Sequence, residues 1–135
     1  GCCGNYAKSS LRRKLLNELL PTLGEDNLIP HEVDLVADNG DDRYGKVSDK
    51  VFILSCDEYR KYRKNVPLLP EWMWTCTPWY ITDAGGSIIV RCVGTDGSLH
   101  GNDAYYTYGV LPVCIFNPEK VKIEYQFANV KEKTE

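Results

Sequence analysis

The sequence has little of what metal-binding and catalytic sites most often require. Its 135 residues include only two histidines, and its six cysteines form no Cys-x-x-Cys pair. A structural zinc site gathers several closely spaced Cys and His ligands, so we expect neither a metal site nor a cofactor. The cysteine count alone does not decide whether disulfides form. Because the chain has enough Leu, Val, Ile and Tyr to build a core without them, we expect mostly free, half-buried thiols.

Charge of one sign and long apolar runs are also scarce. The 16 Lys and Arg residues stand against 19 Asp and Glu residues, which gives a formal charge of -3. Nucleic-acid-binding surfaces neutralise phosphates with clustered Lys and Arg, so this balance argues against nucleic acid as a partner. Apolar runs such as residues 51–54 fall far below the roughly 20 residues of a membrane helix, and no secretory leader pattern is present. We therefore expect no membrane insertion.

The length and the apolar content suit one packed core. With 135 residues, 43% of them apolar, there is little room for a second core. We predict a single domain over residues 1–135 with its core at about 5–118. Residues 119–135 form a C-terminal extension, in which residues 121–125 alternate like an edge strand and the charged residues after 130 form a tail.

The first half of the chain predicts two helices. A leucine stripe with Arg12 on the outward side indicates a helix over residues 10–20, begun by Ser9 or Ser10 and ended by Pro21. Residues 21–49 are rich in Pro, Gly, Asn and Asp and predict a long surface connection that includes His31. A strand at residues 50–54 then leads into a second, short helix that begins with a Ser-x-x-Glu capping box, Ser55 and Glu58. We expect this helix to bury Tyr59 and Tyr62.

From residue 71 onward, aromatic and β-branched residues alternate with glycine-containing turns. Residues 88–93 and 105–116 read as strands, and an Asp96-Gly97 turn lies between them. Trp72 and Trp74 alternate with Met73, which favours a strand with one core face. The second half therefore predicts an antiparallel sheet, and the whole chain an α+β domain with two helices packed on a twisted antiparallel sheet.

Five landmarks in order resemble an uncharacterised domain family of gut bacteria and phages. They are the segments Asn5-Tyr6-Ala7-Lys8-Ser9-Ser10-Leu11-Arg12, Lys50-Val51-Phe52-Ile53-Leu54-Ser55, Trp74-Thr75-Cys76-Thr77-Pro78, Thr95-Asp96-Gly97-Ser98 and Tyr108-Gly109-Val110-Leu111-Pro112. The family typically has Trp-Trp-Leu-Arg-Ser-Pro at the third and Tyr-Gly-Val-Arg-Pro at the fifth. It looks related to the C-type-lectin-like fold shared with formylglycine-generating enzymes, so the resemblance implies that fold and, weakly, an extracellular or cell-surface location.

The chain departs from this pattern at two arginines. Cys76 and Leu111 stand where the family has Arg, and Leu15 replaces a tryptophan of the first helix. A charge held near a sheet needs hydrogen-bonded partners. We therefore predict that a polar cluster has become an apolar contact that joins Cys76, Leu111 and Cys114, with Cys76 a buried free thiol.

We expect no catalytic residues. Formylglycine-generating enzymes use a closely spaced cysteine pair, and the cysteines of the predicted sheet are far apart in sequence; fold kinship alone does not carry activity. Asp38, Asp41 and Asp42 lack the spacing of a calcium-binding loop and are expected in a solvated turn. His31 and His100 are expected in surface loops.

The region around residues 102–108 is the best candidate for binding. Tyrosines beside Asn and Asp make the amphipathic contact surface found in paratopes, and the resemblance places ligand contacts just before the Tyr-Gly-Val motif. We therefore predict a non-catalytic recognition module that binds protein or glycan. The alternatives are a structural or assembly domain whose tyrosines pack internally and, least favoured, a formylglycine-generating-enzyme-like oxidoreductase. The predicted ligand-binding residues are Asn102, Asp103, Tyr105 and Tyr106, with Trp79 and Tyr80 as neighbours.

Overall fold

The N-terminal helix is continuous from residue 10 to residue 23 in the computed structural model, which describes residues 4–121. It consists of α1 (Ser10–Lys14), a π-helical turn (Leu15–Leu19) and α2 (Leu20–Leu23). The Ser9 side chain caps its start by accepting a hydrogen bond from the amide of Arg12 at 3.1 Å. The capping prediction is confirmed at this residue.

Pro21 does not end this helix, contrary to the sequence-based prediction. The π-helical turn lies directly before it, and the Leu20 amide bonds to the Leu15 carbonyl, five residues back. A π-helical turn shifts the hydrogen-bond register of a helix. Proline has no N–H group to donate to the preceding turn, and the wider π-helical turn leaves room for its ring. The helix ends instead at Gly24, where φ is 89°.

Residues 31–49 form a hairpin, although the sequence predicted a surface connection. Strand β1 (His31–Asp34) pairs antiparallel with β2 (Lys46–Asp49). Val33 and Leu35 are fully buried, so the hairpin supplies part of the core. The apolar stretches on either side of the polar turn at residues 38–42 are short, so the composition of the segment predicted a loop rather than two strands.

The strand and helix that follow agree with the sequence. Strand β3 (Val51–Phe52) leads into α3 (Cys56–Tyr62), and Ser55 and Glu58 form the predicted capping box. Tyr59 is buried as predicted. Tyr62 was predicted buried but is 48% exposed, because it lies at the end of a helix too short to bury a second turn.

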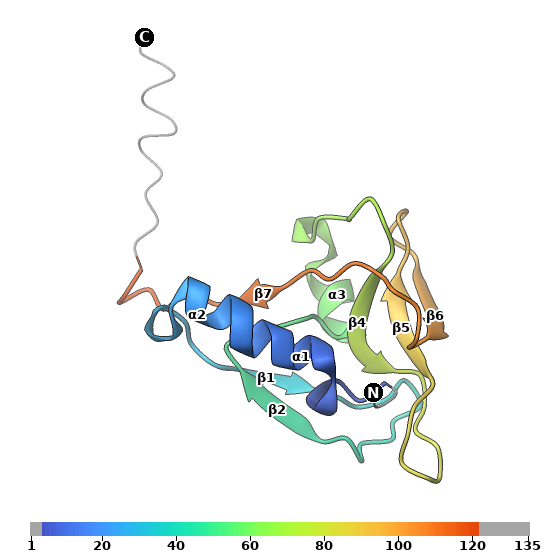
Figure 1. Cartoon of the computed structure of the whole chain (residues 1–135). Helices are drawn as coiled ribbons and strands as arrows, with labels where there is room; N and C mark the ends of the chain where they lie inside the picture. The colour runs from blue at the N-terminus through green and yellow to red at the C-terminus, as the bar shows by residue number, and fades with distance from the viewer. Residues whose placement is uncertain (1–3, 122–135) are drawn as a thin grey trace.

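The second half forms an antiparallel sheet, as predicted, but the strand predicted at residues 105–116 is wrong: residues 104–108 form a loop, and within that stretch only Val113–Cys114 is a strand. Strands β4 (Met73–Pro78), β5 (Ile89–Val93) and β6 (Leu99–Asp103) lie in that order. Strand β7 (Val113–Cys114) pairs with β3 instead of extending this sheet. The described residues are thus α+β, and their strands form three small antiparallel sheets, whose arrangement can be followed in Figure 1. The edge strand predicted at residues 121–125 lies outside the described residues except for Val121.

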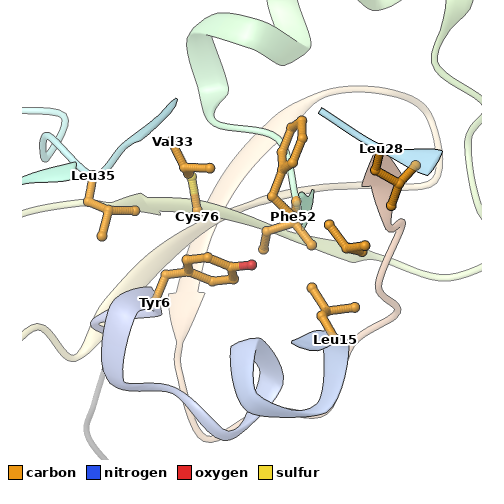
Figure 2. Close-up of a cluster of buried hydrophobic side chains, with 9 residues drawn as sticks. Tyr6, Leu15, Leu28, Val33, Leu35, Phe52 and Cys76 are labelled. Atoms are coloured by element: carbon orange, nitrogen blue, oxygen red, sulfur yellow. The ribbon is translucent and has the colours of Figure 1, made fainter. Parts of the chain in front are cut away.

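Two apolar clusters hold these elements together. The larger one lies between the N-terminal helix, the hairpin and β3, and Figure 2 shows the Tyr6 and Leu15 side chains directed at it from the helical side. The smaller one joins α3 to β4 and β5 through Tyr59, Met73 and Val93. The remaining buried members of the larger cluster are Leu28, Val33, Leu35, Val51, Phe52, Ile53 and Cys76.

An ion pair fixes the N-terminal helix to the hairpin. The Arg12 guanidinium donates two hydrogen bonds of 2.8 Å to the carboxylate of Asp49, whose side chain is only 2% exposed. It also donates to the Ala7 carbonyl at 3.1 Å. The sequence placed Arg12 on the outward side of the helix; the partner at the end of β2 could not be inferred from helical periodicity.

Replacing Tyr6 with Phe should not destabilise the protein. The Tyr6 hydroxyl is buried without a hydrogen-bond partner among the described residues, so its removal should raise the free energy of unfolding by about 1 kcal/mol. Tyr59→Phe is the matched control, because the Tyr59 hydroxyl donates to the Gly97 carbonyl at 2.7 Å. That variant should lose about 1 kcal/mol. Urea denaturation measures both, and a Tyr6→Phe protein less stable than the parent contradicts the assignment.

Breaking the Arg12–Asp49 pair should be costly. Arg12→Met leaves the buried Asp49 carboxylate unpaired, which should cost about 3 kcal/mol, the low end for a buried pair because Arg12 keeps some solvent contact. The double variant Arg12→Met/Asp49→Leu should regain most of that loss. Denaturant unfolding of the two variants tests this, and equal stability of the single and double variants would reject it.

Candidate functional site

A groove lies between the N-terminal helix and the loop that follows β6. We call it the aromatic groove; its volume is about 470 Å³. The helix contributes one wall, β4 and β5 the floor, and residues 104–108, here called the tyrosine loop, the other wall. The groove is lined by Gly4, Asn5, Tyr6, Ser9, Ser10, Leu11, Lys14, Ile53, Trp74, Thr75, Cys76, Val90, Ala104, Tyr105, Tyr106, Thr107, Tyr108 and Val110.

The tyrosine loop has a defined backbone because Asp103 and its neighbours bond to it. The Asp103 carboxylate accepts a hydrogen bond from the Tyr105 amide at 3.0 Å, and the Asp103 carbonyl accepts one from the Tyr106 amide at 3.0 Å. The amide of Ala104 bonds to the Ile88 carbonyl at 2.8 Å. The loop therefore turns away from β6, and Tyr105 and Tyr106 are exposed on it.

Asn102 acts on the loop through Tyr108. Its side-chain amide donates to the Tyr108 hydroxyl at 2.7 Å. The Tyr108 ring lies 4.6 Å from that of Trp74 and 6.0 Å from that of Tyr106, centroid to centroid. Asn102 and Asp103 are thus supports of the loop, and the exposed surface belongs to Tyr105 and Tyr106, which are 76% and 55% exposed.

The aromatic surface continues beyond the predicted residues. Trp72 lies 5.7 Å from Tyr108 and stacks on His100 at 4.4 Å. The sequence predicted that one face of this strand lies in the core. In the structure Met73 is the residue that packs in the core, and Trp72 and Trp74 are half-buried on the opposite face. The alternation of Trp72 and Trp74 with Met73 indicates a strand with two different faces. The contacts of both tryptophans with Tyr108 show that they lie on the face opposite Met73.

Trp79 lies on the other face of the β4–β5–β6 sheet. A Cβ atom on Gly101 would meet its ring at 2.1 Å, so the ring packs directly on the Gly101 backbone. Side chains alternate between faces along a strand, and Gly101 neighbours Asn102, so Trp79 and Asn102 are on opposite faces. The Arg91 guanidinium lies 5.1 Å from the Trp79 ring. Trp79 and Tyr80 are 45% and 39% exposed.

The structure therefore divides the predicted site. Asn102, Tyr105 and Tyr106 belong to the groove side of the sheet, and Trp79 belongs to the far side. The strand β6 separates them, since its residues alternate between the two.

Both histidines lie in strands rather than in the surface loops predicted for them. His31, in β1, stacks on Phe52 at 4.4 Å and lies 2.6 Å from the Glu58 carboxylate. His100 stacks on Trp72 and bonds to the Ser98 hydroxyl at 2.7 Å. A second, acidic cavity of about 270 Å³ lies beside Glu58 and Cys56. Among residues 4–121 no group of three or more potential ligands is placed to hold a metal ion.

Two aspartates of the predicted solvated turn, Asp38 and Asp41, form ion pairs. Asp41 pairs with Arg43 at 2.8 Å, and Asp38 pairs with Arg91. The Arg43 guanidinium lowers the pKa of the Asp41 carboxyl. Because Arg91 is bound by Asp38, its position beside Trp79 is fixed.

The four cysteines within residues 4–121 are free thiols; Cys56, Cys76 and Cys92 are buried and Cys114 is half-buried. Cys76 is a free thiol and 2% exposed, as predicted. Burial raises the pKa of Cys76 well above its usual range and that of Cys92 to about 11. The predicted contact between Cys76 and Leu111 is wrong: Cys76 and Cys114 pack in the larger apolar cluster, whereas Leu111 packs in the smaller one. Cys76 and Leu111, the two positions at which the family has arginine, therefore have separate environments. Strand β4 contributes to both clusters, with Cys76 in the larger and Met73 in the smaller.

The comparisons with known proteins give no relative for this chain. No family model, curated protein or solved structure matches it. Within residues 4–121, no helix has the length and apolar character that a membrane crossing requires.

Thiol labelling should separate the cysteines. In a Cys2→Ser/Cys3→Ser variant at neutral pH, we expect a thiol reagent to modify the half-buried Cys114 first and the buried Cys56, Cys76 and Cys92 only on unfolding. Mass spectrometry of timed digests gives the rate at each site. Labelling of Cys76 as fast as that of Cys114 in the folded protein contradicts the burial.

Proposed function

We propose that this chain is a non-catalytic ligand-recognition module that binds protein or glycan through the tyrosine loop and the aromatic groove. The observation that carries the proposal is the exposure of Tyr105 and Tyr106, at 76% and 55%, beside a cavity of about 470 Å³. Contiguous apolar patches on a protein surface mark interaction sites more often than single exposed apolar residues do. Tyrosine suits such a role, because it offers a large apolar face, a hydroxyl and few rotatable bonds.

Preorganisation of the loop supports this proposal. The main chain of residues 104–106 is bonded to Asp103 and Ile88 before any ligand arrives. A ligand therefore does not have to order the backbone, which is a large part of the entropic cost of binding. The groove lining also includes the side-chain amide of Asn5 and the hydroxyl of Thr107 next to the rings, and polar groups of this kind fix a ligand's orientation.

The state of the thiols favours recognition over catalysis. A catalytic cysteine needs a lowered pKa, and burial raises the pKa of Cys56, Cys76 and Cys92 instead. This direction argues against the formylglycine-generating-enzyme-like alternative.

The family and the fold family are part of the proposal. The α+β architecture, with a helix and a hairpin ahead of an antiparallel sheet, is compatible with the C-type-lectin-like fold that the sequence landmarks imply. We propose accordingly that the module belongs to a surface or phage-associated protein of gut bacteria and acts outside the cell.

A structural or assembly role is the second candidate. The contact of Trp74 and Tyr106 with Tyr108 favours it, because rings that pack on one another also serve as internal filling. The two roles differ in what removal of an exposed ring does. A filling role predicts lost stability, and a binding role predicts lost affinity with stability retained.

The test is an array of glycans and bacterial surface proteins probed with the whole chain and with two variants. Tyr105→Ala and Tyr106→Ala should each weaken binding to a hit by about tenfold or more, since truncation of a central aromatic costs roughly 2 kcal/mol. Tyr62→Ala is the matched control, an exposed tyrosine on α3. Unchanged binding by both variants, or a comparable loss with Tyr62→Ala, rejects the proposed site.

A further inference from the structure

Within residues 4–121, strand β6 has no neighbouring strand on its outer edge. It is the outer strand of the sheet order β4-β5-β6, and Figure 1 shows no described strand beyond it. The bonds from Gly94 to Ser98 and from Ala104 to Ile88 fix which residues of β6 face β5. By the alternation of an antiparallel ladder, His100 and Asn102 bond to β5, and the main-chain groups of Leu99 and Gly101 point away from it.

These outward groups have no hydrogen-bond partner in the described part of the chain. Among residues 4–121, the N–H groups of Leu99 and Gly101 donate no hydrogen bond and their C=O groups accept none. At Asp103 the turn uses the corresponding groups, since its amide bonds to Asn102 and its carbonyl to Tyr106. The free stretch therefore spans Leu99 to Gly101 and ends at the tyrosine loop.

The edge also lacks the features that usually prevent strand pairing. Proteins protect such edges with lysine, proline, a bulge or a covering segment. Residues 99–103 contain no lysine or proline, and the pairing of β5 with β6 is regular from Ile89–Asp103 to Val93–Leu99. Asp103 is the only residue of the strand that carries a carboxylate.

Side chains on both faces of the sheet meet at this edge. On the far face, the Trp79 ring lies over the Gly101 backbone and beside Arg91. On the groove face, Asn102 and Tyr108 lead to Tyr106. Trp79 on one face and Asn102 on the other thus both lie at strand β6.

We infer that β6 binds an extended polypeptide segment of a partner protein as an added strand. This inference rests on the proposed recognition function and narrows its ligand to polypeptide. Alternating N–H and C=O groups at the spacing of a β-strand match another main chain, and a saccharide has no such repeat. Side chains of the added strand alternate between the two faces, so one set contacts Trp79 and the other contacts the groove-face residues of β6.

The probe is a library of ten-residue peptides displayed on phage and selected against the whole chain. The best binder is synthesised in three forms: unmodified, N-methylated at odd positions and N-methylated at even positions. In an added strand only one of these two sets of amides faces β6. One methylated form should therefore bind at least about tenfold more weakly, a loss of roughly 1.4 kcal/mol, while the other retains the parent affinity.

Amide exchange and one variant complete the test. The bound peptide should slow hydrogen exchange at Leu99 and Gly101, and Trp79→Ala should lower its affinity while Trp79→Phe retains most of it. Equal binding by both methylated forms, unchanged exchange at those two amides or a selection without binders each overturns strand addition. Sedimentation that shows copies of the chain pairing through β6 also overturns it.

The outcome for the proposed function remains distinguishable. A glycan or protein bound on the array in a Tyr105-dependent manner, without any peptide on β6, retains the recognition function and rejects strand addition. Loss of both the array signal and the peptide binding rejects both.

Discussion

The ion pair between Arg12 and Asp49 determines where the aromatic groove can exist. It joins the first turn of the N-terminal helix to the last residue of the hairpin, two elements that otherwise meet only through side-chain packing. Packing of leucines alone permits a helix to rotate or slide by small amounts. A bidentate bond to a buried carboxylate has a direction, so it fixes the helix that forms one wall of the groove.

This interaction links sequence, packing and site. Ser9, which begins the helix, and Arg12, which ties it down, are one helical turn apart, and the groove wall contains Ser9, Ser10 and Leu11 on the same turn. The opposite wall is positioned independently, by Asp103 and Asn102 at the end of β6. The groove is therefore bounded by two short segments, each fixed by side-chain hydrogen bonds.

Local patterns predicted the elements whose signals are local. The leucine stripe, the Ser55–Glu58 capping box and the Asp96-Gly97 turn each correspond to an observed element. Two predictions about the N-terminal helix fail for different reasons. Helical periodicity places Arg12 outward because it contains no information on Asp49, 37 residues away. Pro21 predicts the end of the helix because the π-helical turn before it leaves no sequence signature. For the site, residue types identified the tyrosine loop, but opposite faces for Trp79 and Asn102 follow only from the strand register.

The tyrosine loop is held at both ends by main-chain atoms. Ala104 bonds to the Ile88 carbonyl, and Gly109 exchanges bonds with the backbone of Trp72 and Trp74. Between these anchors, residues 105, 106 and 107 are all exposed. Backbone anchoring does not depend on which side chains the loop carries. Substitution at these three positions can therefore change the shape and chemistry of the exposed surface over evolutionary time, at little cost to the stability of the rest of the fold.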